Sequence, residues 1–289
     1  MSERDPLPVR GFLLHITHYD PRWYRAKGRE RPFDLDLALE VVDTMADVGL
    51  NLLVIDCEDG VEYASHPDLA RRYTVPMEQL ETLARRARAH GIEVVPKINF
   101  ARSSYHHHND WFRPYDRLFD TGEYWQRAFQ IVDELIAACR PERFFHIGMD
   151  EDHDRAYSQY VAAIETLHRG LAERGLRPVI WNDSAHQGPA LIHAEKSLLA
   201  EKTIPRDVVQ VPWEYSRPQP ETIRRLTDAG FEVWGAPGRT PDLVVAWRDD
   251  LLRYGGKGLL LTFWRPCRPS NRAAMLRLLR EVGPVCRGE

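Results

Sequence analysis

Short apolar runs alternate with longer amphipathic runs along most of this chain. The short runs are rich in Val, Ile, Leu and Phe, which is typical of buried strands, and the longer runs repeat their apolar positions with helical spacing. The sequence therefore predicts eight strands, at residues 11–17, 51–56, 93–99, 143–148, 177–181, 208–213, 231–235 and 258–263. It predicts a helix after each strand, at residues 34–48, 77–90, 122–139, 154–173, 188–199, 220–228, 242–254 and 271–282.

Four glycines mark the predicted helix ends. Gly49, Gly91, Gly175 and Gly230 each follow a helical run and precede a strand, where a left-handed C-terminal cap favours glycine. Strands that alternate with helices form a parallel sheet. Eight such units in 289 residues predict an α/β protein with a single (β/α)8 barrel over residues 1–289, rather than an open sheet.

The fourth predicted strand ends in the most distinctive chemistry of the chain. Residues 144–151 read FFHIGMDE, an apolar strand followed by His-x-Gly-x-Asp-Glu. Active sites of such barrels lie at the carboxyl ends of the strands, and adjacent carboxylates there are costly unless they take part in chemistry. Asp150 and Glu151 are therefore candidate acid–base residues. In the alternative interpretation, Asp150 caps the next helix and Glu151 is an acid of its first turn.

Other strand ends carry polar and aromatic residues that the barrel would bring to the same face. Tryptophan recurs at these ends, and its ring can stack on the apolar C–H face of a sugar, although tryptophan also fills protein cores. The candidate binding residues at these ends are His15, Asp59, Asn99, His146, Trp181, Asp183, Trp213, Tyr215, Trp264 and Arg265.

The composition and charge of the chain limit the kinds of molecule that the protein is expected to bind. Apolar residues make up 43% of the chain, and the net charge of -4 comes from interspersed acidic and basic residues, which argues against nucleic acid or an anionic membrane as partner. No run approaches the length of a membrane span. The N-terminus lacks the apolar core of a signal peptide, and the four cysteines show no Cys-x-x-Cys spacing, so a cytoplasmic protein with reduced thiols is expected. The oligomeric state is not readable from the sequence.

These motifs resemble the catalytic barrel of family 20 glycoside hydrolases, the β-N-acetylhexosaminidases. The segment FFHIGMDED is similar to that family's His-x-Gly-Gly-Asp-Glu motif, with Met149 at the second glycine. The first-strand segment VRGFLLHITHYD would place Arg10 at a sugar-binding arginine, and MADVGLNLLVIDCEDG would place Asp59 at the first aspartate of a second-strand Asp-Asp pair. The segment AHGIEVVPKINF resembles a third-strand phrase that normally reads Val-Ile-Pro-Glu-Ile-Asp.

The resemblance implies a retaining hydrolase whose substrate supplies its own acetamide as the nucleophile. Glu151 would be the general acid and base, and Asp150 would orient the acetamide. Arg10 would hold ring hydroxyls, and His146 would support the acids from beneath or be a core histidine. Trp181, Trp213 and Trp264 would wall the acetamide. The implied partner is a small carbohydrate, with no metal and no cofactor.

The chain also departs from the family pattern. Lys97 and Asn99 replace the two third-strand acids, and Ser103 stands where the family has a histidine. The eighth strand is followed by Trp264-Arg265-Pro266 in place of Trp-x-Glu, so a sugar-binding glutamate is missing. Arg265 is either a surface arginine or a cation that accepts a sugar carrying sulfate, phosphate or carboxylate.

Two other functions stay open at this point. A metal-dependent barrel hydrolase or isomerase would use histidines such as His15, His18 and residues 106–108, although their spacing does not favour one site. A carbohydrate-binding pseudoenzyme would explain the altered third and eighth strands. The stretch 100–121 is long enough for a functional loop, which either clamps the substrate, with Tyr105, Trp111 and Tyr115 as contacts, or mediates self-association.

Overall fold

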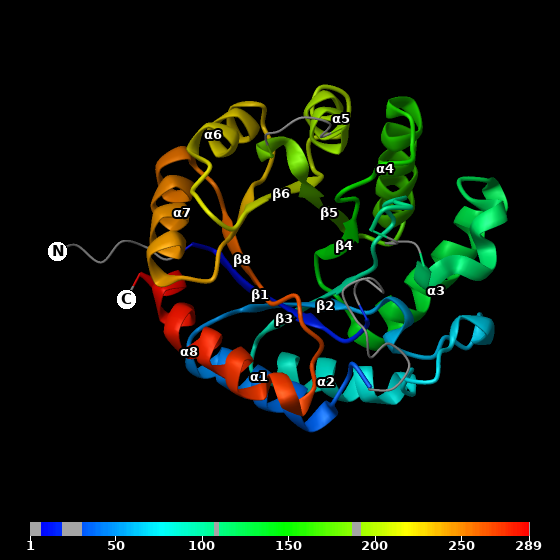
Figure 1. Ribbon diagram of the computed structural model, residues 1–289, viewed down its shortest axis with the longest axis horizontal. Coiled ribbons are helices and arrows are strands. Elements are labelled where there is room, and N and C mark those ends of the chain that lie inside the picture. The colour runs from blue at the N-terminus through cyan, green and yellow to red at the C-terminus, as the bar shows by residue number, and fades with distance from the viewer. Residues whose placement is uncertain (1–6, 19–30, 107–109, 187–191, 289) are drawn as a thin grey trace.

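The computed structural model describes residues 7–18, 31–106, 110–186 and 192–288, and these form a closed eight-stranded barrel. Each strand pairs in parallel with its sequence neighbours, and β1 closes the barrel against β8. Figure 1 shows the strands as an inner ring with the helices outside it. The strands are β1 (Val9–His15), β2 (Leu52–Asp56), β3 (Glu93–Lys97), β4 (Phe144–Gly148), β5 (Arg177–Asn182), β6 (Val209–Glu214), β7 (Trp234–Pro237) and β8 (Gly258–Thr262).

One α-helix follows each strand, so the predicted (β/α)8 barrel is confirmed. The helices are α1 (Leu35–Asp47), α2 (Met77–Ala89), α3 (Gly122–Cys139), α4 (Tyr157–Ala172), α5 (Ile192–Ala200), α6 (Pro220–Asp228), α7 (Pro241–Tyr254) and α8 (Arg272–Arg287). Short 3₁₀ helices lie in the connections, among them η3 (Asp110–Leu118) and η4 (Asp183–Ala185).

Alternate residues of each strand serve two separate cores. Leu13 and Val54 point into the barrel, where they join an interior cluster with Phe144 and Trp234. Their neighbours, such as Phe12, point outward and join the larger core between strands and helices. Because both faces are buried, the strands read as continuous apolar runs, which is why they were visible in the sequence.

The largest differences between the observed and the predicted elements are at β7, α4 and α8. β7 begins at Trp234, because Phe231 belongs to the turn after α6, where its amide bonds to the carbonyl of Leu226. Helix α4 begins at Tyr157 rather than at residue 154, and α8 continues to Arg287. Residues 188–191 of the predicted fifth helix lie outside the described residues.

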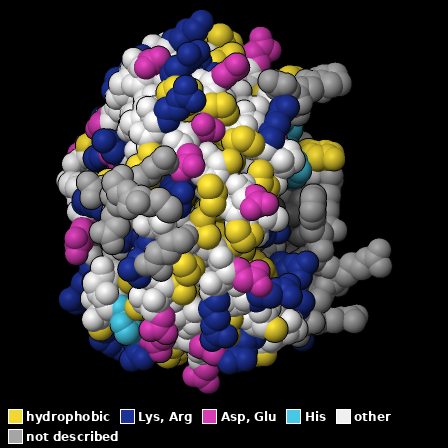
Figure 2. Space-filling view, turned by 90° about the vertical axis from the view of Figure 1, so that its left-hand side faces the viewer, with side chains coloured by type: hydrophobic (Ala, Val, Ile, Leu, Met, Phe, Trp, Pro, Cys, Tyr) yellow, Lys and Arg dark blue, Asp and Glu magenta, His cyan; other side chains and the backbone are white. Residues whose placement is uncertain are grey.

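The distribution of surface charge and the state of the cysteines match what the sequence predicts. Acidic and basic side chains are interspersed on the face in Figure 2, which includes α6, α7 and α8. The four cysteines are free and buried. No helix in the described segments is long and apolar enough to span a membrane.

Candidate active site

The turn after β4 holds its backbone in an unfavourable conformation. Gly148, Met149 and Glu151 all have positive φ angles, of 70°, 75° and 49°. For Met149 and Glu151 such a backbone is strained, and strain of this kind concentrates at functional sites. A Cβ atom on Gly148 would lie 2.3 Å from Oδ1 of Asn99, so this position needs glycine for space as well as for its φ angle.

This turn is not a helix cap. α4 begins only at Tyr157, with Ala156 as its N-cap, and Gln159 accepts a hydrogen bond from the Ala156 amide. The alternative interpretation of Asp150 and Glu151 as cap and first-turn acid is therefore wrong. The two carboxylates stand between strand and helix, at the mouth of the barrel.

Asn99 fixes the position of Asp150. Its Nδ2 donates to Oδ1 of Asp150 at 2.7 Å, and its Oδ1 accepts from the amides of Ala101 at 2.9 Å and Met149 at 3.1 Å. Asp150 is 4% exposed and makes no other hydrogen bond through its carboxylate within the described residues. No described residue therefore donates to its second oxygen. The structure places the predicted binding residue Asn99 against Asp150, as a support for it.

Glu151 is more accessible than Asp150. Its carboxylate is 17% exposed and lies 3.4 Å from Nε2 of His106, while its backbone amide donates to Oδ2 of Asp183 at 2.7 Å. His106 stands in the loop where the family histidine is replaced by Ser103, whose hydroxyl accepts from the His106 amide. The sequence offers His106 only as one of the metal-ligand histidines of residues 106–108. It does not predict the contact with Glu151, because the place of a loop side chain depends on the fold of the loop and not on a strand or helix period.

Asp183 is a buried carboxyl group beside these two acids. Its Oδ1 accepts from the Trp213 indole N–H at 2.8 Å, so it ties β5 to β6 as well as to Glu151. Burial and the neighbouring charge of Asp150 raise the pKa of Asp183 to about 8. Asp183 is therefore predominantly neutral at pH 7, which reduces repulsion with Asp150.

A buried charge network lies at the ends of β1, β2 and β3. Asp56 accepts from Nδ1 of His15 at 2.7 Å and from Nζ of Lys97 at 2.6 Å. Burial alone would raise the pKa of Asp56, but Lys97 and His15 outweigh it and hold the pKa below its ordinary value. Glu58 lies 3.7 Å from Lys97, and burial together with the charge of Asp56 raises its pKa well above the ordinary value. The expected ligand residue His15 thus pairs with Asp56.

Asp59 is also engaged by its neighbours. It accepts hydrogen bonds from the hydroxyls of Thr17 and Tyr73, and it is only 3% exposed. The structure therefore places Asp59 beneath the surface of the barrel mouth.

An aromatic wall faces the acids. Trp181, at the end of β5, lies 5.6 Å from Trp264 between ring centroids. Trp264 donates its indole N–H to the Tyr215 hydroxyl at 2.6 Å, and Tyr215 lies 5.5 Å from Trp213. These four residues, predicted from three different strand ends, are brought together. His186 packs against Trp213 at 3.7 Å.

Two polar groups at the base of this wall have no hydrogen-bond partner among the described residues. His146 is fully buried 4.6 Å from the Trp181 ring, and burial lowers its pKa well below the ordinary value. Its Nδ1 accepts from the amide of Gly148, so the neutral ring carries its proton on Nε2. That N–H and the Trp181 Nε1–H are both unpaired in the part of the chain described, which is costly and marks a place for polar ligand atoms or water. Among the described residues, His146 makes no hydrogen bond to Asp150 or Glu151, so it does not support them in the way the sequence predicts.

Arg10 does not belong to this site. It is the second residue of β1, so it lies about 16 Å from the end of the strand that carries His15. Its guanidinium donates to the carbonyls of Gly49 and Leu7 at the opposite end of the barrel. The prediction that Arg10 binds sugar hydroxyls at the active-site end is wrong.

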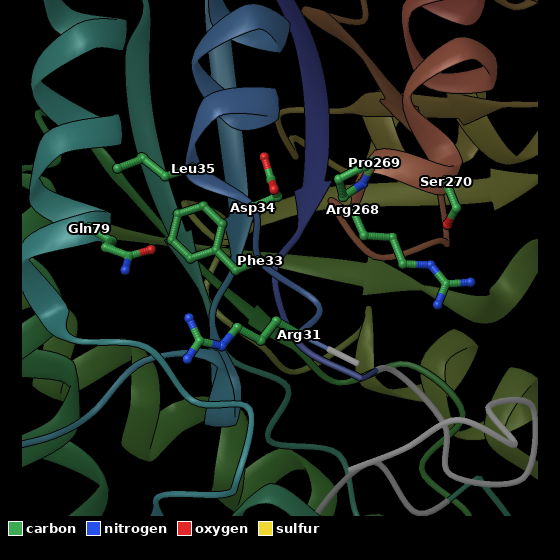
Figure 3. Close-up of a pocket in the computed structure, with 8 residues that line it drawn as sticks. All are labelled: Arg31, Phe33, Asp34, Leu35, Gln79, Arg268, Pro269 and Ser270. Atoms are coloured by element: carbon green, nitrogen blue, oxygen red, sulfur yellow. The ribbon is translucent and has the colours of Figure 1, made fainter. Parts of the chain in front are cut away.

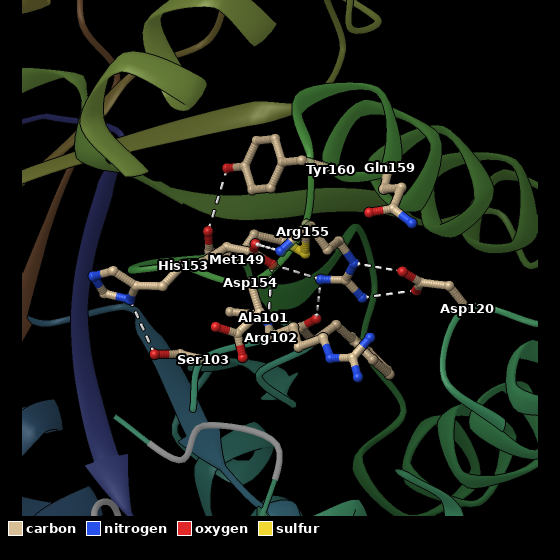
Figure 4. Close-up of polar contacts among 12 residues, drawn as sticks. Ala101, Arg102, Ser103, Asp120, Met149, His153, Asp154, Arg155, Gln159 and Tyr160 are labelled. Carbon is tan, nitrogen blue, oxygen red and sulfur yellow. Dashed lines mark hydrogen bonds and ion pairs between the residues drawn. The ribbon is translucent and has the colours of Figure 1, made fainter. Parts of the chain in front are cut away.

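Arg155 fixes the segment that joins the two acids to α4. Its guanidinium makes two bonds of 2.9 Å to Asp120 and further bonds to Asp152 and the carbonyl of Phe100, as Figure 4 shows in part. Asp152 also accepts from Nζ of Lys196. This buried network anchors the strained turn to the loop after β3.

The loop after β3 is packed more tightly than a substrate clamp would be. Trp111 is buried against Phe112 and donates to the carbonyl of Asn99 at 3.0 Å. Tyr115 donates to Asp68, away from the acids, and Tyr105 is 60% exposed. Trp111 is therefore a support of the site, contrary to its expected role as a substrate contact.

One cavity lies apart from the barrel mouth. It has a volume of about 480 Å³ and lies among the starts of α1, α2 and α8 (Figure 3). Its lining residues are Arg31, Phe33, Asp34, Leu35, Gln79, Arg268, Pro269 and Ser270. None of the expected site residues lines it.

The histidines of this region do not form a metal site with the acids. Among the residues that the structure describes, no group of three or more His, Cys, Asp or Glu side chains is arranged to hold a metal ion. His107 and His108 lie outside the described residues.

The same barrel occurs in solved structures of known hexosaminidases. The Streptomyces plicatus N-acetyl-β-hexosaminidase in complex with Thio-NAglucal matches with a TM-score of 0.71 and 16% identity, over 98% of this chain and 64% of that one. The GH20 exo β-N-acetylglucosaminidase from Vibrio harveyi, in complex with N-acetylglucosamine, matches with a TM-score of 0.71 and 15% identity over 99% and 55%. This chain has the fold of the GH20 hexosaminidases.

The similarity is one of structure and not of sequence. Dispersin B matches with a TM-score of 0.59 and 15% identity over 96% of this chain and 98% of its own. No protein-family model and no curated protein matches the sequence. The chain spans less than two thirds of the two hexosaminidases named first.

Proposed function

We propose that this protein hydrolyses a terminal β-linked N-acetylhexosamine with retention of configuration, using the acetamide of the substrate as the nucleophile. The observation that carries the proposal is the pair of carboxylates on the strained turn. Asp150 is buried and fixed by Asn99, whereas Glu151 is partly exposed beside His106. Two adjacent acids with different surroundings suit two different roles.

Glu151 is the proton-transfer group in this mechanism. It protonates the oxygen of the leaving group while the acetamide carbonyl oxygen bonds to C1 and the glycosidic bond breaks. It then takes a proton from the water that attacks C1 and opens the resulting oxazolinium ring. His106, at 3.4 Å, stabilises the Glu151 carboxylate after the first proton transfer.

Asp150 accepts the acetamide N–H. Its Oδ1 is held by Asn99, which leaves Oδ2 for the substrate. In that position its negative charge aligns the carbonyl oxygen with C1 and stabilises the positive charge on the ring nitrogen of the intermediate. Asp183, neutral at pH 7, leaves Asp150 as the main negative charge at this point.

The aromatic wall provides the apolar surface for the sugar. Trp181, Trp213 and Trp264 are close enough to enclose the acetamide methyl group and to stack on the ring. This arrangement excludes water from the intermediate until the leaving group has departed.

Release of 4-nitrophenol from 4-nitrophenyl 2-acetamido-2-deoxy-β-D-glucoside and β-D-galactoside tests the proposal. Wild-type turnover should fall at least about 100-fold in Glu151→Gln and in Asp150→Ala. Glu281→Gln, on the exposed side of α8, is the matched control and should keep wild-type turnover. Turnover that is unchanged in Glu151→Gln would contradict the proposal, and binding of sugar without turnover would favour a carbohydrate-binding pseudoenzyme.

A further inference from the structure

Two arginines stand at the ends of β7 and β8, next to the aromatic wall. Arg239 follows β7, and its Nε–H donates to the carbonyl of Thr262, the last residue of β8, at 3.1 Å. Its guanidinium carbon lies 5.8 Å from the centroid of the Tyr215 ring. Arg265 follows Trp264 directly. The backbone bond and the tyrosine ring fix Arg239 at the edge of the proposed sugar site.

Neither arginine has an acidic partner among the described residues. Within the residues that the structure describes, no carboxylate forms an ion pair with Arg239 or Arg265, and the two terminal nitrogens of Arg239 make no hydrogen bond. Burial and the positive charge of Arg265 lower the pKa of Arg239. Arg155 and Arg225, in contrast, each bind a carboxylate through two nitrogens. The pair is therefore a concentration of positive charge that no described carboxylate neutralises.

The acids lie on the other side of the barrel mouth. In a closed ring of eight strands, β4 is opposite β8 and β3 is opposite β7. Asp150 and Glu151 follow β4, whereas Arg265 follows β8, with Trp181 and Trp264 in contact between the two sides. Glu214, at the end of β6, accepts hydrogen bonds from the amide and the hydroxyl of Ser216.

The separation of the acids from the arginines across the barrel mouth fixes which way a bound sugar would point. In a pyranose, C1 and the C4–C6 end lie on opposite sides of the ring. If the glycosidic oxygen at C1 meets Glu151, the C4–C6 end points toward β7 and β8. The groups that meet Arg239 and Arg265 are therefore the substituents at C4 or C6.

We propose that Arg239 and Arg265 form a subsite for an anionic substituent at the C4–C6 end of the sugar, and that the preferred substrate is an acidic N-acetylhexosamine. This inference rests on the proposed function. A sulfate ester, a phosphate ester and a carboxylate all present the same pattern of anionic oxygens to a guanidinium, which binds them through two parallel N–H bonds. Arg239 keeps both terminal nitrogens available for such a group.

Paired neutral and charged substrates test the subsite. 4-Nitrophenyl 2-acetamido-2-deoxy-β-D-glucoside and its 6-sulfate are compared by kcat/KM, and the charged glycoside should be preferred at least about tenfold. The preference should fall to about onefold in the double variant Arg239→Ala/Arg265→Ala and should weaken as the salt concentration rises. Arg280→Ala, an exposed arginine of α8, is the control and should keep the preference. Arg265→Ala alone changes only an exposed residue and should reduce the preference several-fold even if Arg239→Ala unfolds the protein.

Binding of the free sugars separates this inference from the proposed function. Calorimetric titrations with 2-acetamido-2-deoxyglucose, its 6-sulfate, its 6-phosphate and its 6-carboxylate should give tighter binding for at least one charged form, and the order among the three identifies the anion. Cleavage of the neutral glycoside with no preference for a charged one would overturn the subsite and leave the hydrolase proposal standing. Tight binding of a charged sugar without cleavage of any glycoside would support the subsite and contradict hydrolysis. A preference that persists in the double variant would also overturn the assignment.

Discussion

The replacement Asn99→Ala is the most informative perturbation of the site, because Asn99 joins the loop after β3 to the turn that carries the acids. To the described residues its side chain makes three bonds, one to the carboxylate of Asp150 and two to the amides of Ala101 and Met149. All three lie in a buried region, where Asn99 itself is 2% exposed. Alanine would remove all of them without adding a new group.

The expected loss of folding stability follows from the kinds of hydrogen bond that the substitution removes. A hydrogen bond to a charged group contributes about 1.5–3 kcal/mol, and each neutral backbone bond contributes about 1 kcal/mol. Asn99→Ala should therefore lower the free energy of unfolding by about 3–5 kcal/mol. The strained φ angle of Met149 would also lose one of the bonds that maintain it, so Asp150 should move and the turnover should fall by about two orders of magnitude.

Urea unfolding followed by tryptophan fluorescence measures the first quantity. Asn99→Asp provides the matched variant, because it keeps an acceptor for the two amides and removes the amide donor to Asp150. At low pH a protonated aspartic acid can still donate, so Asn99→Asp should be less destabilising at about pH 5 than at about pH 8. A loss below about 1 kcal/mol in Asn99→Ala, or no pH dependence in Asn99→Asp, would refute the role of Asn99 as the support of Asp150.

Further predictions concern the buried charges and the turn. Lys97→Met should cost about 3–5 kcal/mol in denaturant unfolding, because it leaves Asp56 buried without its cation, and adding Asp56→Asn should recover part of the loss; no recovery would argue against this pairing. Gly148→Ala should destabilise by more than about 3 kcal/mol, since its Cβ would meet Asn99, whereas Gly175→Ala, with a similar φ of 73° and open space, should cost about 1–2 kcal/mol; equal losses would show that the contact is relieved. Burial raises the pKa of Asp183 to about 8, so the stability that its neutral form contributes is present below the ordinary carboxyl pKa and is lost as pH rises through about 8. The melting temperature of Asp183→Asn relative to wild type should therefore increase between about pH 5 and about pH 9, and a constant difference would count against the raised pKa.

The barrel was predictable from the sequence because its signals are local. Each strand is an apolar run with both faces buried, and each helix has its own amphipathic period, so the order of the elements already implied a closed parallel sheet. The mouth residues Asp150, Glu151, Trp181, Trp213 and Trp264 followed from one rule, that chemistry collects where the strands end.

The errors arose where a residue's position depends on packing beyond its own element. The resemblance of the first-strand Arg-Gly segment predicts that Arg10 binds the sugar. Arg10 lies at the start of β1, however, and therefore at the other end of the barrel. The apolar character of Phe231 predicts a strand residue, but Phe231 lies in the turn after α6, where its amide bonds to the carbonyl of Leu226. His106 lies in a loop without periodicity, so only the folded chain places it against Glu151.

Arg239 and Arg265 are a second case in which the sequence does not predict a contact between distant segments. The sequence placed Arg265 after Trp264 and left two interpretations open. It gave no sign that Arg239, 26 residues earlier, lies beside it, since that proximity follows from the pairing of β7 with β8. The two positive charges act on each other only because the folded barrel brings the ends of β7 and β8 together.

The most direct test of the account is the configuration of the first sugar that the wild-type protein releases. Proton NMR of 4-nitrophenyl 2-acetamido-2-deoxy-β-D-glucoside, or of its 6-sulfate, during hydrolysis distinguishes the two anomers before they equilibrate. Hydrolysis through the acetamide passes through two inversions at C1, so the β-anomer should appear first and the α-anomer only later by mutarotation. Release of the α-anomer first, or no release from either glycoside, would contradict the proposal that Asp150 and Glu151 carry out substrate-assisted hydrolysis.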